Sequence, residues 1–254
     1  MKVTFLGSGT SQGVPVIGCT CEVCTSLDFR DKRLRSSIHI ELSRQSFVVD
    51  TGPDFRQQML RERVKRIDAV LFTHAHRDHT AGLDDVRAYN FMQKMDMPVY
   101  GTQPVLDQLR IEFAYAFMKD TYPGIPRLLF HLIDDKPFSV NGIEVLPLPV
   151  MHLKMPVHGF RFGNFSYITD ANFIPEETFE KLKGTEILVL NALQRETHIS
   201  HFNLVEALQV IEKIKAKKTY LTHISHKLGT HADVSRELPA NVMLAYDGLQ
   251  FDLG

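Results

Sequence analysis

The chain is short of cysteine, of long apolar runs and of net charge, and each shortage excludes a class of protein. It has three cysteines in 254 residues, all within positions 19–24. Three cysteines cannot all pair with one another, and we expect reduced thiols in a cytoplasmic protein. No stretch comes near the roughly 18 apolar residues of a transmembrane helix, so we expect no membrane partner. The apolar run at the N-terminus is too short for a signal peptide.

Positive and negative charges in the sequence are nearly balanced. The formal net charge is −1. Without a basic excess to draw the chain to polyanions, we expect no nucleic-acid partner. The basic run Lys213–Lys218 lies at an expected helix end, where cations complement the helix dipole. We therefore interpret this run as a solvated helix terminus.

The sequence predicts one α/β domain over residues 1–254. Apolar residues make up 44% of the chain, enough for a large core, and no repeat or linker divides it. Runs of strands with helices between them predict two sheets with helices packed outside. The expected strands include Met1–Leu6, Ile38–Leu42, Ser46–Asp50, Ile67–Phe72, Gly159–Arg161, Ser166–Thr169 and Lys218–Thr222, and the expected helices include Pro53–Arg63, Gly82–Lys94 and Leu204–Ile214.

A histidine-rich segment, His74-Ala75-His76-Arg77-Asp78-His79, directly follows the apolar strand Ile67–Phe72. Residues i and i+2 of an extended segment point to the same side, so His74 and His76 can bind the same metal ion. Asp78 and His79 fall where a helix is expected to begin, and they can address a second ion. Imidazole and carboxylate are suitable ligands for Zn, Mn or Fe. The segment therefore predicts a metal site.

Three further candidate ligands stand at the ends of expected strands. His152 follows the apolar run Val145–Met151, Asp170 ends the run that begins at Phe165, and His223 ends the strand Lys218–Thr222. A two-metal centre needs ligands from several strand ends. One such residue alone would more often be structural, but all three in this order after His-x-His-x-Asp-His form a specific signal.

On these residues and the turn Asp50-Thr51-Gly52, nearly the whole chain resembles the metallo-β-lactamase superfamily. The resemblance implies a four-layer αββα sandwich, in the α/β class, with two divalent metals, Zn or Mn, at one edge. Asp50 would order the ligand loop by hydrogen bonding instead of binding metal. The implied ligands are His74, His76 and His152 for one ion, Asp78, His79 and His223 for the other, and Asp170 as a bridge between them.

Within that superfamily, the chain resembles the PhnP-type phosphodiesterases, which are related to tRNase Z. The resemblance rests on the segment Gly7–Pro15, the three cysteines, and the blocks His201–Leu204 and Leu221–His226. It implies a homodimer and hydrolysis of a small cyclic phosphate or nucleotide-like phosphodiester by a metal-bridging hydroxide. It also implies catalytic roles for Asp78 and His201. His201 is the candidate proton donor to the leaving oxygen, and His198 is the alternative.

The stretch Gly-Cys-Thr-Cys-Glu-Val-Cys at residues 18–24 is open to several interpretations. It could hold a disulfide with a spare thiol, a nucleophile with neighbours, three reduced surface cysteines, or three ligands of a closed tetrahedral zinc site. The PhnP resemblance places a fourth ligand at His226. We therefore expect a structural zinc held by Cys19, Cys21, Cys24 and His226.

Other functional classes share parts of this pattern. A tRNA 3′-processing endonuclease has the same core, but the sequence lacks a long Gly- and Pro-rich arm of the kind that grips tRNA. A lactone or thiolester hydrolase of the same fold would use similar metals. A non-catalytic binding or redox module would have lost ligands, and none of the seven expected active-site ligands is missing.

Overall fold

The computed structural model describes residues 1–118 and 122–253. The chain separates into two compact units, neither of them continuous in sequence. The first comprises Met1–Leu6, Ser37–Asp134 and Gly248–Gly254, and the second comprises Gly7–Ser36 and Asp135–Asp247. Each unit has its own sheet and its own helices, so they are described one at a time. A single domain over residues 1–254 stays a prediction.

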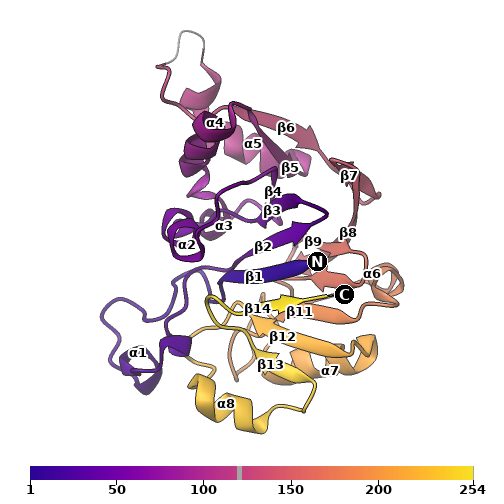
Figure 1. The fold of residues 1–254 in the computed structure, drawn as a ribbon. Helices are drawn as coiled ribbons and strands as arrows, with labels where there is room; N and C mark the ends of the chain where they lie inside the picture. Colours follow the sequence, from indigo (N-terminus) through magenta and orange to yellow (C-terminus); the bar gives the residue numbers. More distant parts are fainter. Residues whose placement is uncertain (119–121, 254) are drawn as a thin grey trace. The chain divides into compact units, whose positions relative to one another are not determined.

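The first unit contains a sheet of seven strands in the order β14-β1-β2-β3-β4-β5-β6 within the described residues. The strands of the two chain ends, β1 and β14, pair antiparallel, as Figure 1 shows beside the labelled termini. From β3 to β6 the pairings are parallel. The strand bounds are β1 Lys2–Gly7, β2 Ser37–Leu42, β3 Gln45–Val49, β4 Ala69–Leu71, β5 Met97–Gly101, β6 Leu128–Leu132 and β14 Gln250–Asp252.

Helices of the first unit cover its parallel strands. Their apolar side chains, among them Phe55, Met59 and Leu109, join Val70 and Val99 of the sheet in one buried cluster. The expected helix Gly82–Lys94 is divided, because a 3-10 turn comes before the α-helix. The helical bounds are α2 Phe55–Glu62, α3 Arg77–Thr80, η2 Leu83–Val86, α4 Arg87–Gln93, α5 Gln103–Glu112 and η3 Ala114–Phe117.

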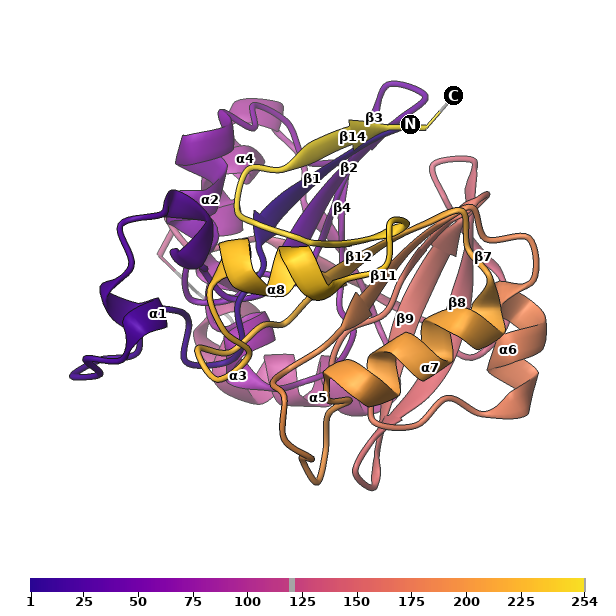
Figure 2. The same ribbon diagram turned by 90° about the horizontal axis from the view of Figure 1, so that it is seen from below.

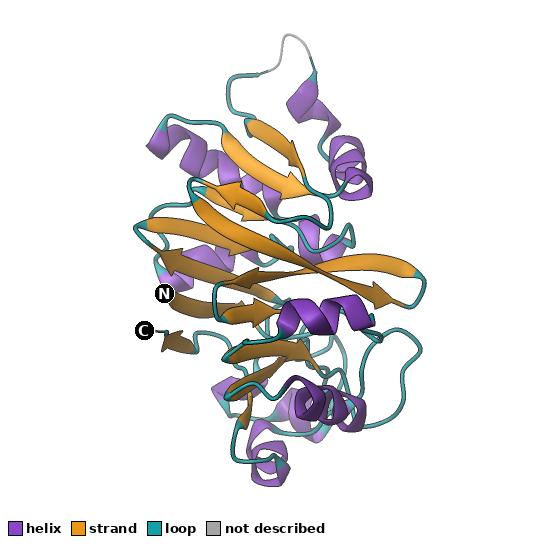
Figure 3. Ribbon diagram, turned by 90° about the vertical axis from the view of Figure 1, so that its right-hand side faces the viewer, coloured by secondary structure: helices purple, strands orange, loops and turns teal. Residues whose placement is uncertain are grey.

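The second unit contains the other seven-stranded sheet of the described residues, in the order β13-β12-β11-β10-β9-β8-β7. Its longest strands, β8 and β9, form the antiparallel hairpin that is prominent in Figure 3. β10, β11 and β12 are mutually parallel. The strand bounds are β7 Phe138–Val140, β8 Ile143–His152, β9 Met155–Phe162, β10 Phe165–Tyr167, β11 Ile187–Asn191, β12 Lys218–Thr222 and β13 Val242–Leu244.

Helices α6 and α7 lie beside the strands of the second sheet (Figure 2). Leu182 of α6 and Leu204, Ala207 and Ile211 of α7 share a buried cluster with Leu148 of β8. The amphipathic pattern predicted α7 with its observed bounds. The helical bounds are α1 Glu22–Thr25, η1 Phe29–Asp31, α6 Glu176–Leu182, α7 Leu204–Ile214 and α8 His231–Glu237.

Tertiary pairing extends some strands beyond their sequence signal. β9 runs over Met155–Phe162, whereas the sequence predicted only Gly159–Arg161, because β9 pairs with β8 from Leu146 to His152. Among the residues that the structure describes, no helix combines the length and the apolar character needed to cross a bilayer.

The start of α7 offers a test of the fold. Asn203 Oδ1 accepts a hydrogen bond from the Glu206 amide at 2.9 Å, and the Asn203 amide donates to Glu206 Oε2 at 2.9 Å. Asn203→Ala removes this cap and is expected to lower the free energy of unfolding by about 1 kcal/mol. Asn203→Asp keeps the acceptor and is the matched control. Urea unfolding of both variants measures the difference, and equal stability of the two would show that the cap contributes nothing.

Candidate metal-binding sites

The histidine-rich segment of the first unit occupies the loop that follows β4 and the short helix α3. The ring centroid of His74 lies 4.7 Å from that of His76 and 4.3 Å from that of His79. His79 Nε2 lies 3.2 Å from Asp78 Oδ2. Asp78 and His79 fall in the first helical turn, as expected. The structure thus brings together all four predicted ligands of this unit.

Asp50 organises this cluster from the end of β3. Its carboxylate accepts hydrogen bonds from the Thr73 amide at 2.9 Å, from Thr73 Oγ1 at 2.8 Å and from His79 Nδ1 at 2.7 Å. Burial raises the pKa of Asp50, whereas His79 and Thr73 favour its ionised form. Because Nδ1 of His79 donates to Asp50, Nε2 carries the lone pair of the ring, on the side of Asp78. The structure shows the hydrogen bonds of Asp50, and its role in ordering metal ligands stays a prediction.

Backbone hydrogen bonds join the turn after Asp50 to α3, the short helix that contains Asp78 and His79. The Thr51 amide donates to the His79 carbonyl at 2.7 Å, and the Gly82 amide donates to the Thr51 carbonyl at 2.8 Å. A Cβ at Gly82 would lie 2.2 Å from the Gly52 carbonyl oxygen, so only glycine allows this approach.

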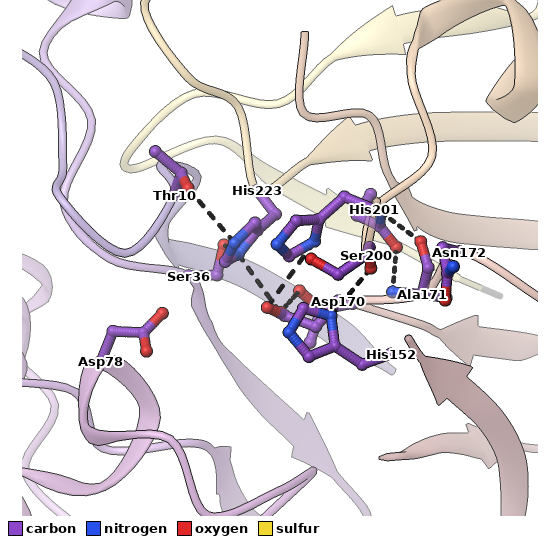
Figure 4. A network of polar contacts seen from close by, with 12 residues as sticks. Thr10, Ser36, Asp78, His152, Asp170, Ala171, Asn172, Ser200, His201 and His223 are labelled. Carbon is purple, nitrogen blue, oxygen red and sulfur yellow. Dashed lines mark hydrogen bonds and ion pairs between the residues drawn. The ribbon is translucent and has the colours of Figure 1, made fainter. Parts of the chain in front are cut away.

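In the second unit, the predicted ligands occupy the ends of three strands that run in the same direction. His152 is the last residue of β8, Asp170 lies three residues after β10, and His223 directly follows β12. Asp170 and His223 have left-handed backbones, with φ of 57° and 55°. Carboxyl ends of parallel-running strands share one sheet edge, which gathers these side chains (Figure 4).

Distances within this cluster show that His201 belongs to it. His223 Nδ1 lies 3.2 Å from Asp170 Oδ2, and His201 Nδ1 lies 3.9 Å from Asp170 Oδ1. The His201 ring centroid lies 4.5 Å from that of His152 and 4.9 Å from that of His223. Nitrogen and oxygen atoms of His152, Asp170 and His201 are close enough together to share one metal ion. Imidazole and carboxylate donors of this kind fit a divalent transition metal.

Neighbours that sequence reasoning missed hold the second cluster in place. His152 Nδ1 donates to the Ser200 carbonyl at 2.8 Å, which leaves Nε2 with the lone pair. His223 contacts Ser36 Oγ at 3.2 Å and Thr10 Oγ1 at 3.4 Å. The Asn191 side chain bonds both the amide and the carbonyl of Ala171, next to Asp170. Thr10 lies in the segment Gly7–Pro15 that carries the PhnP resemblance, whereas Ser36 and Asn191 belong to no motif and had no signal in the sequence.

His201 is neutral in this environment. Burial is the main cause that lowers its pKa to about 3, and His223 adds to the shift. Burial also lowers the pKa of His198, whose ring centroid lies 5.1 Å from that of His201. Of the two candidate proton donors, His201 is the one that reaches Asp170.

The three cysteines gather around one histidine in the second unit. Sγ of Cys19 and of Cys21 each lie 3.3 Å from His226 Nδ1, and Sγ of Cys24 lies 3.5 Å from it. A tetrahedral zinc with bonds of about 2.3 Å to sulfur and 2.0 Å to nitrogen would separate such atoms by roughly 3.5 Å. The four residues therefore fit a closed zinc site.

The cysteines of this cluster differ in how easily they lose a proton. A hydrogen bond from the Cys24 amide is the main cause that lowers the pKa of Cys21 to about 6. Burial raises the pKa of Cys24 to about 11, although its Sγ accepts from the Val16 amide at 3.4 Å. Cys21 is thus the thiolate already favoured at neutral pH.

Comparison with known proteins places this geometry in a family. Residues 45–224 match the family described as Beta-lactamase superfamily domain. The crystal structure titled as a new diphosphatase from the PhnP family is 40% identical, with a TM-score of 0.93 over 100% of this chain and 98% of that one. Zn²⁺-bound PqqB from Methylobacterium extorquens is 19% identical, with a TM-score of 0.77 over 100% of both chains. The predicted α/β class and metallo-β-lactamase fold are confirmed.

One curated relative is named as a transferase and not as a hydrolase. An octanoyltransferase from Porphyromonas gingivalis is 40% identical over 98% of this chain but only 51% of its own length. This chain spans about half the length, or less, of the first curated relatives it matches. The activity named for that longer protein is therefore not carried over to this chain.

The buried carboxylate of Asp50 provides a test of the first cluster. Asp50→Asn disturbs the acceptor of His79 Nδ1 and is expected to weaken divalent-metal retention by about 10- to 100-fold. Asp68→Asn is the matched control, since Asp68 is buried in the same unit but holds the Ser46 amide and Arg66. Metal content after dialysis against graded chelator is the measurement. Equal metal loss in the two variants would contradict the role of Asp50.

Proposed function

This chain belongs to the β-lactamase superfamily and, within it, to the PhnP family, and on that premise we propose that it is a phosphoric diester hydrolase. Membership makes it a metallo-hydrolase that uses divalent metals. Its substrate would be a small cyclic phosphate or nucleotide-like phosphodiester. The observation that carries the proposal is the placement of His201, an extra histidine beside the ligands Asp170 and His223. Such a group can move a proton where a leaving oxygen departs.

The proposed metal ligands are those that the family resemblance assigns. His74, His76 and His152 would hold one ion, Asp78, His79 and His223 the other, and Asp170 would bridge them. The gathering of these residues within each unit supports the assignment. Two bound ions, Zn or Mn, would supply a water of lowered pKa and would polarise the phosphoryl oxygens.

Hydrogen bonds within this protein would position the metal-binding histidines. Asp50 keeps His79 in one tautomer and orientation, and the Ser200 carbonyl does the same for His152. His201 is neutral before substrate arrives. An anionic phosphoryl group near His201 would favour its protonated form, and the charge of Asp170 acts in the same direction. His201 would then carry a proton to the leaving alkoxide.

A phosphoric anhydride is the second candidate substrate class. It is favoured by the similarity to the PhnP-family structure titled as a diphosphatase. Hydrolysis of either ester or anhydride breaks a P–O bond in the same in-line manner. The two classes differ in the leaving group, because a phosphate leaving group needs less help from a proton donor than an alkoxide does.

Cys19, Cys21, Cys24 and His226 are proposed to bind a separate structural zinc. Their ligand atoms already have the spacing of a tetrahedral site. His226 lies three residues after His223, so a zinc there would tie the N-terminal loop to the turn that carries a catalytic-metal ligand. Zinc would then stabilise the active site without taking part in the reaction.

Leaving-group chemistry tests the proposed function and the role of His201 together. The wild type is expected to hydrolyse bis-p-nitrophenyl phosphate and a cyclic ribose phosphate, but neither a lactone nor a precursor tRNA. His201→Gln should lower kcat about 10²- to 10⁴-fold on the cyclic phosphate and far less on the nitrophenyl ester, whose leaving group needs no proton.

His198→Gln is the matched control, because His198 neighbours His201 and does not reach Asp170. An equal loss on both substrates in His201→Gln would contradict the proton-donor role. Turnover of the lactone without turnover of any phosphodiester would overturn the proposed function.

The cysteine cluster predicts a zinc that responds to pH. Cys21→Ser is expected to lose one zinc per chain and to weaken catalysis indirectly. In the wild type, zinc retention should fall steadily as the pH is lowered, because protons compete with the metal for all three thiolates, and burial of Cys24 raises the pKa of its thiol. Metal analysis after gel filtration measures both effects. Glu22→Gln is the control, and unchanged zinc in Cys21→Ser would contradict the site.

A further inference from the structure

We propose that the first unit carries a second binding site, for a small organic phosphate such as a sugar phosphate or mononucleotide. The site is a pocket of about 350 Å³, here named the basic pocket, which lies where β3 begins and where the chain approaches β4. The histidine-rich loop follows the other end of β4, so the two sites lie at opposite ends of these strands. The basic pocket is lined by Lys2, Thr4, His39, Glu41, Arg44, Gln45, Ser46, Glu62, Arg63, Val64, Lys65, Arg66 and Gln250.

Charge distinguishes the basic pocket from the rest of the molecule. Five of its lining side chains are cationic and two are carboxylates, whereas the whole chain has a net charge of −1. Two other cavities, one beside α7 and one between α2 and α4, are each lined by one cationic residue and one acidic residue. A concave surface with an excess of positive charge concentrates anions.

Three of the cations are available to a ligand. Lys2 pairs with Glu41 at 3.4 Å and Arg66 pairs with Asp68 at 2.7 Å. Within residues 1–118 and 122–253, no hydrogen bond or ion pair engages the side chains of Arg44, Arg63 and Lys65. Guanidinium groups bind phosphate through paired N–H donors, so two of them with one ammonium suit a phosphate dianion.

Both arginines occupy backbone positions that their residue type seldom adopts. Arg44 has φ of 67° in the turn between β2 and β3, and Arg63 has φ of 53° at the end of α2. Tight hairpin turns of this hand favour Asn and Gly. The sequence has arginine at both positions, and the two residues line the same pocket.

The floor of the basic pocket offers neutral polar groups. Ser46 Oγ donates its only proton to the Arg66 carbonyl at 2.5 Å, so His39 Nε2, 2.7 Å from Ser46 Oγ, must be the donor. Burial lowers the pKa of His39, and its Nδ1 is therefore an acceptor. A pocket lined by this acceptor and by cations suits a ligand with hydroxyl groups as well as a phosphate. The volume lies at the lower end of small-molecule pockets, about 300–1,000 Å³.

Calorimetric titration of the metal-loaded protein tests the basic pocket. Ribose 5-phosphate and 5′-AMP are the probes, with ribose and inorganic phosphate as partial ligands. The variant Arg44→Asn/Arg63→Asn removes both guanidinium groups, and asparagine tolerates the left-handed backbone. The wild type is expected to bind at least one of the two phosphorylated probes, and this variant at least 10-fold more weakly.

The chain supplies a closely matched control. Lys94 and Lys215 are cations with φ of 54° and 60°, at the ends of α4 and α7, and neither lines the basic pocket. Lys94→Asn/Lys215→Asn should bind like the wild type. Lys65→Gln should also weaken binding. Because Lys65 is not among the residues with positive φ, this variant still tests the pocket if the double arginine variant fails to fold.

Four results would overturn the proposal. The first is that the arginine variant and the lysine control bind with equal affinity, and the second is that the wild type binds neither phosphorylated probe. The third is that ribose binds as tightly as ribose 5-phosphate. The fourth is that a single-stranded oligonucleotide binds and the small phosphates do not. The metal ligands are intact in every variant, so failure of the proposed phosphodiesterase activity would leave these outcomes unaffected.

Discussion

The buried carboxylate of Asp50 is the interaction on which the first cluster depends. A carboxylate removed from water is costly unless donors surround it, and Asp50 has the Thr73 amide, Thr73 Oγ1 and His79 Nδ1. These hydrogen bonds orient the His79 ring and hold the loop that follows β4. The backbone bonds of Thr51, made possible by the close approach of Gly82, keep the ligand helix against the same turn.

In the second unit, the buried carboxylate of Asp170 lies 3.2 Å from His223 Nδ1. A backbone carbonyl, that of Ser200, orients His152, and the Asn191 amide group fixes the chain beside Asp170. The predicted ligands lie where β8, β10 and β12 end, and these strands run in the same direction, so the predicted ligands lie at one edge of the sheet. His201 joins this edge from the segment before α7, whose capped start holds it near Asp170.

Two kinds of phosphate recognition are proposed for one chain. At the metal ligands, His201 is neutral, so the attraction for an anion would come from the metals. In the basic pocket, Arg44, Arg63 and Lys65, which have no ion-pair partner among the described residues, would supply the attraction directly. The structural zinc proposed at Cys19, Cys21, Cys24 and His226 would serve neither purpose, since a closed tetrahedral site has no position left for a substrate.

The sequence by itself determined the fold class and the helix Leu204–Ile214, because these depend on local periodicity and on short motifs next to strands. Only the tertiary structure decided the division of the expected helix Gly82–Lys94, the extent of β9 and the short distance from His201 to Asp170. The basic pocket, whose lining runs from Lys2 to Gln250, was also invisible in the sequence. Each of these depends on contacts between segments far apart in the chain, which local patterns do not encode.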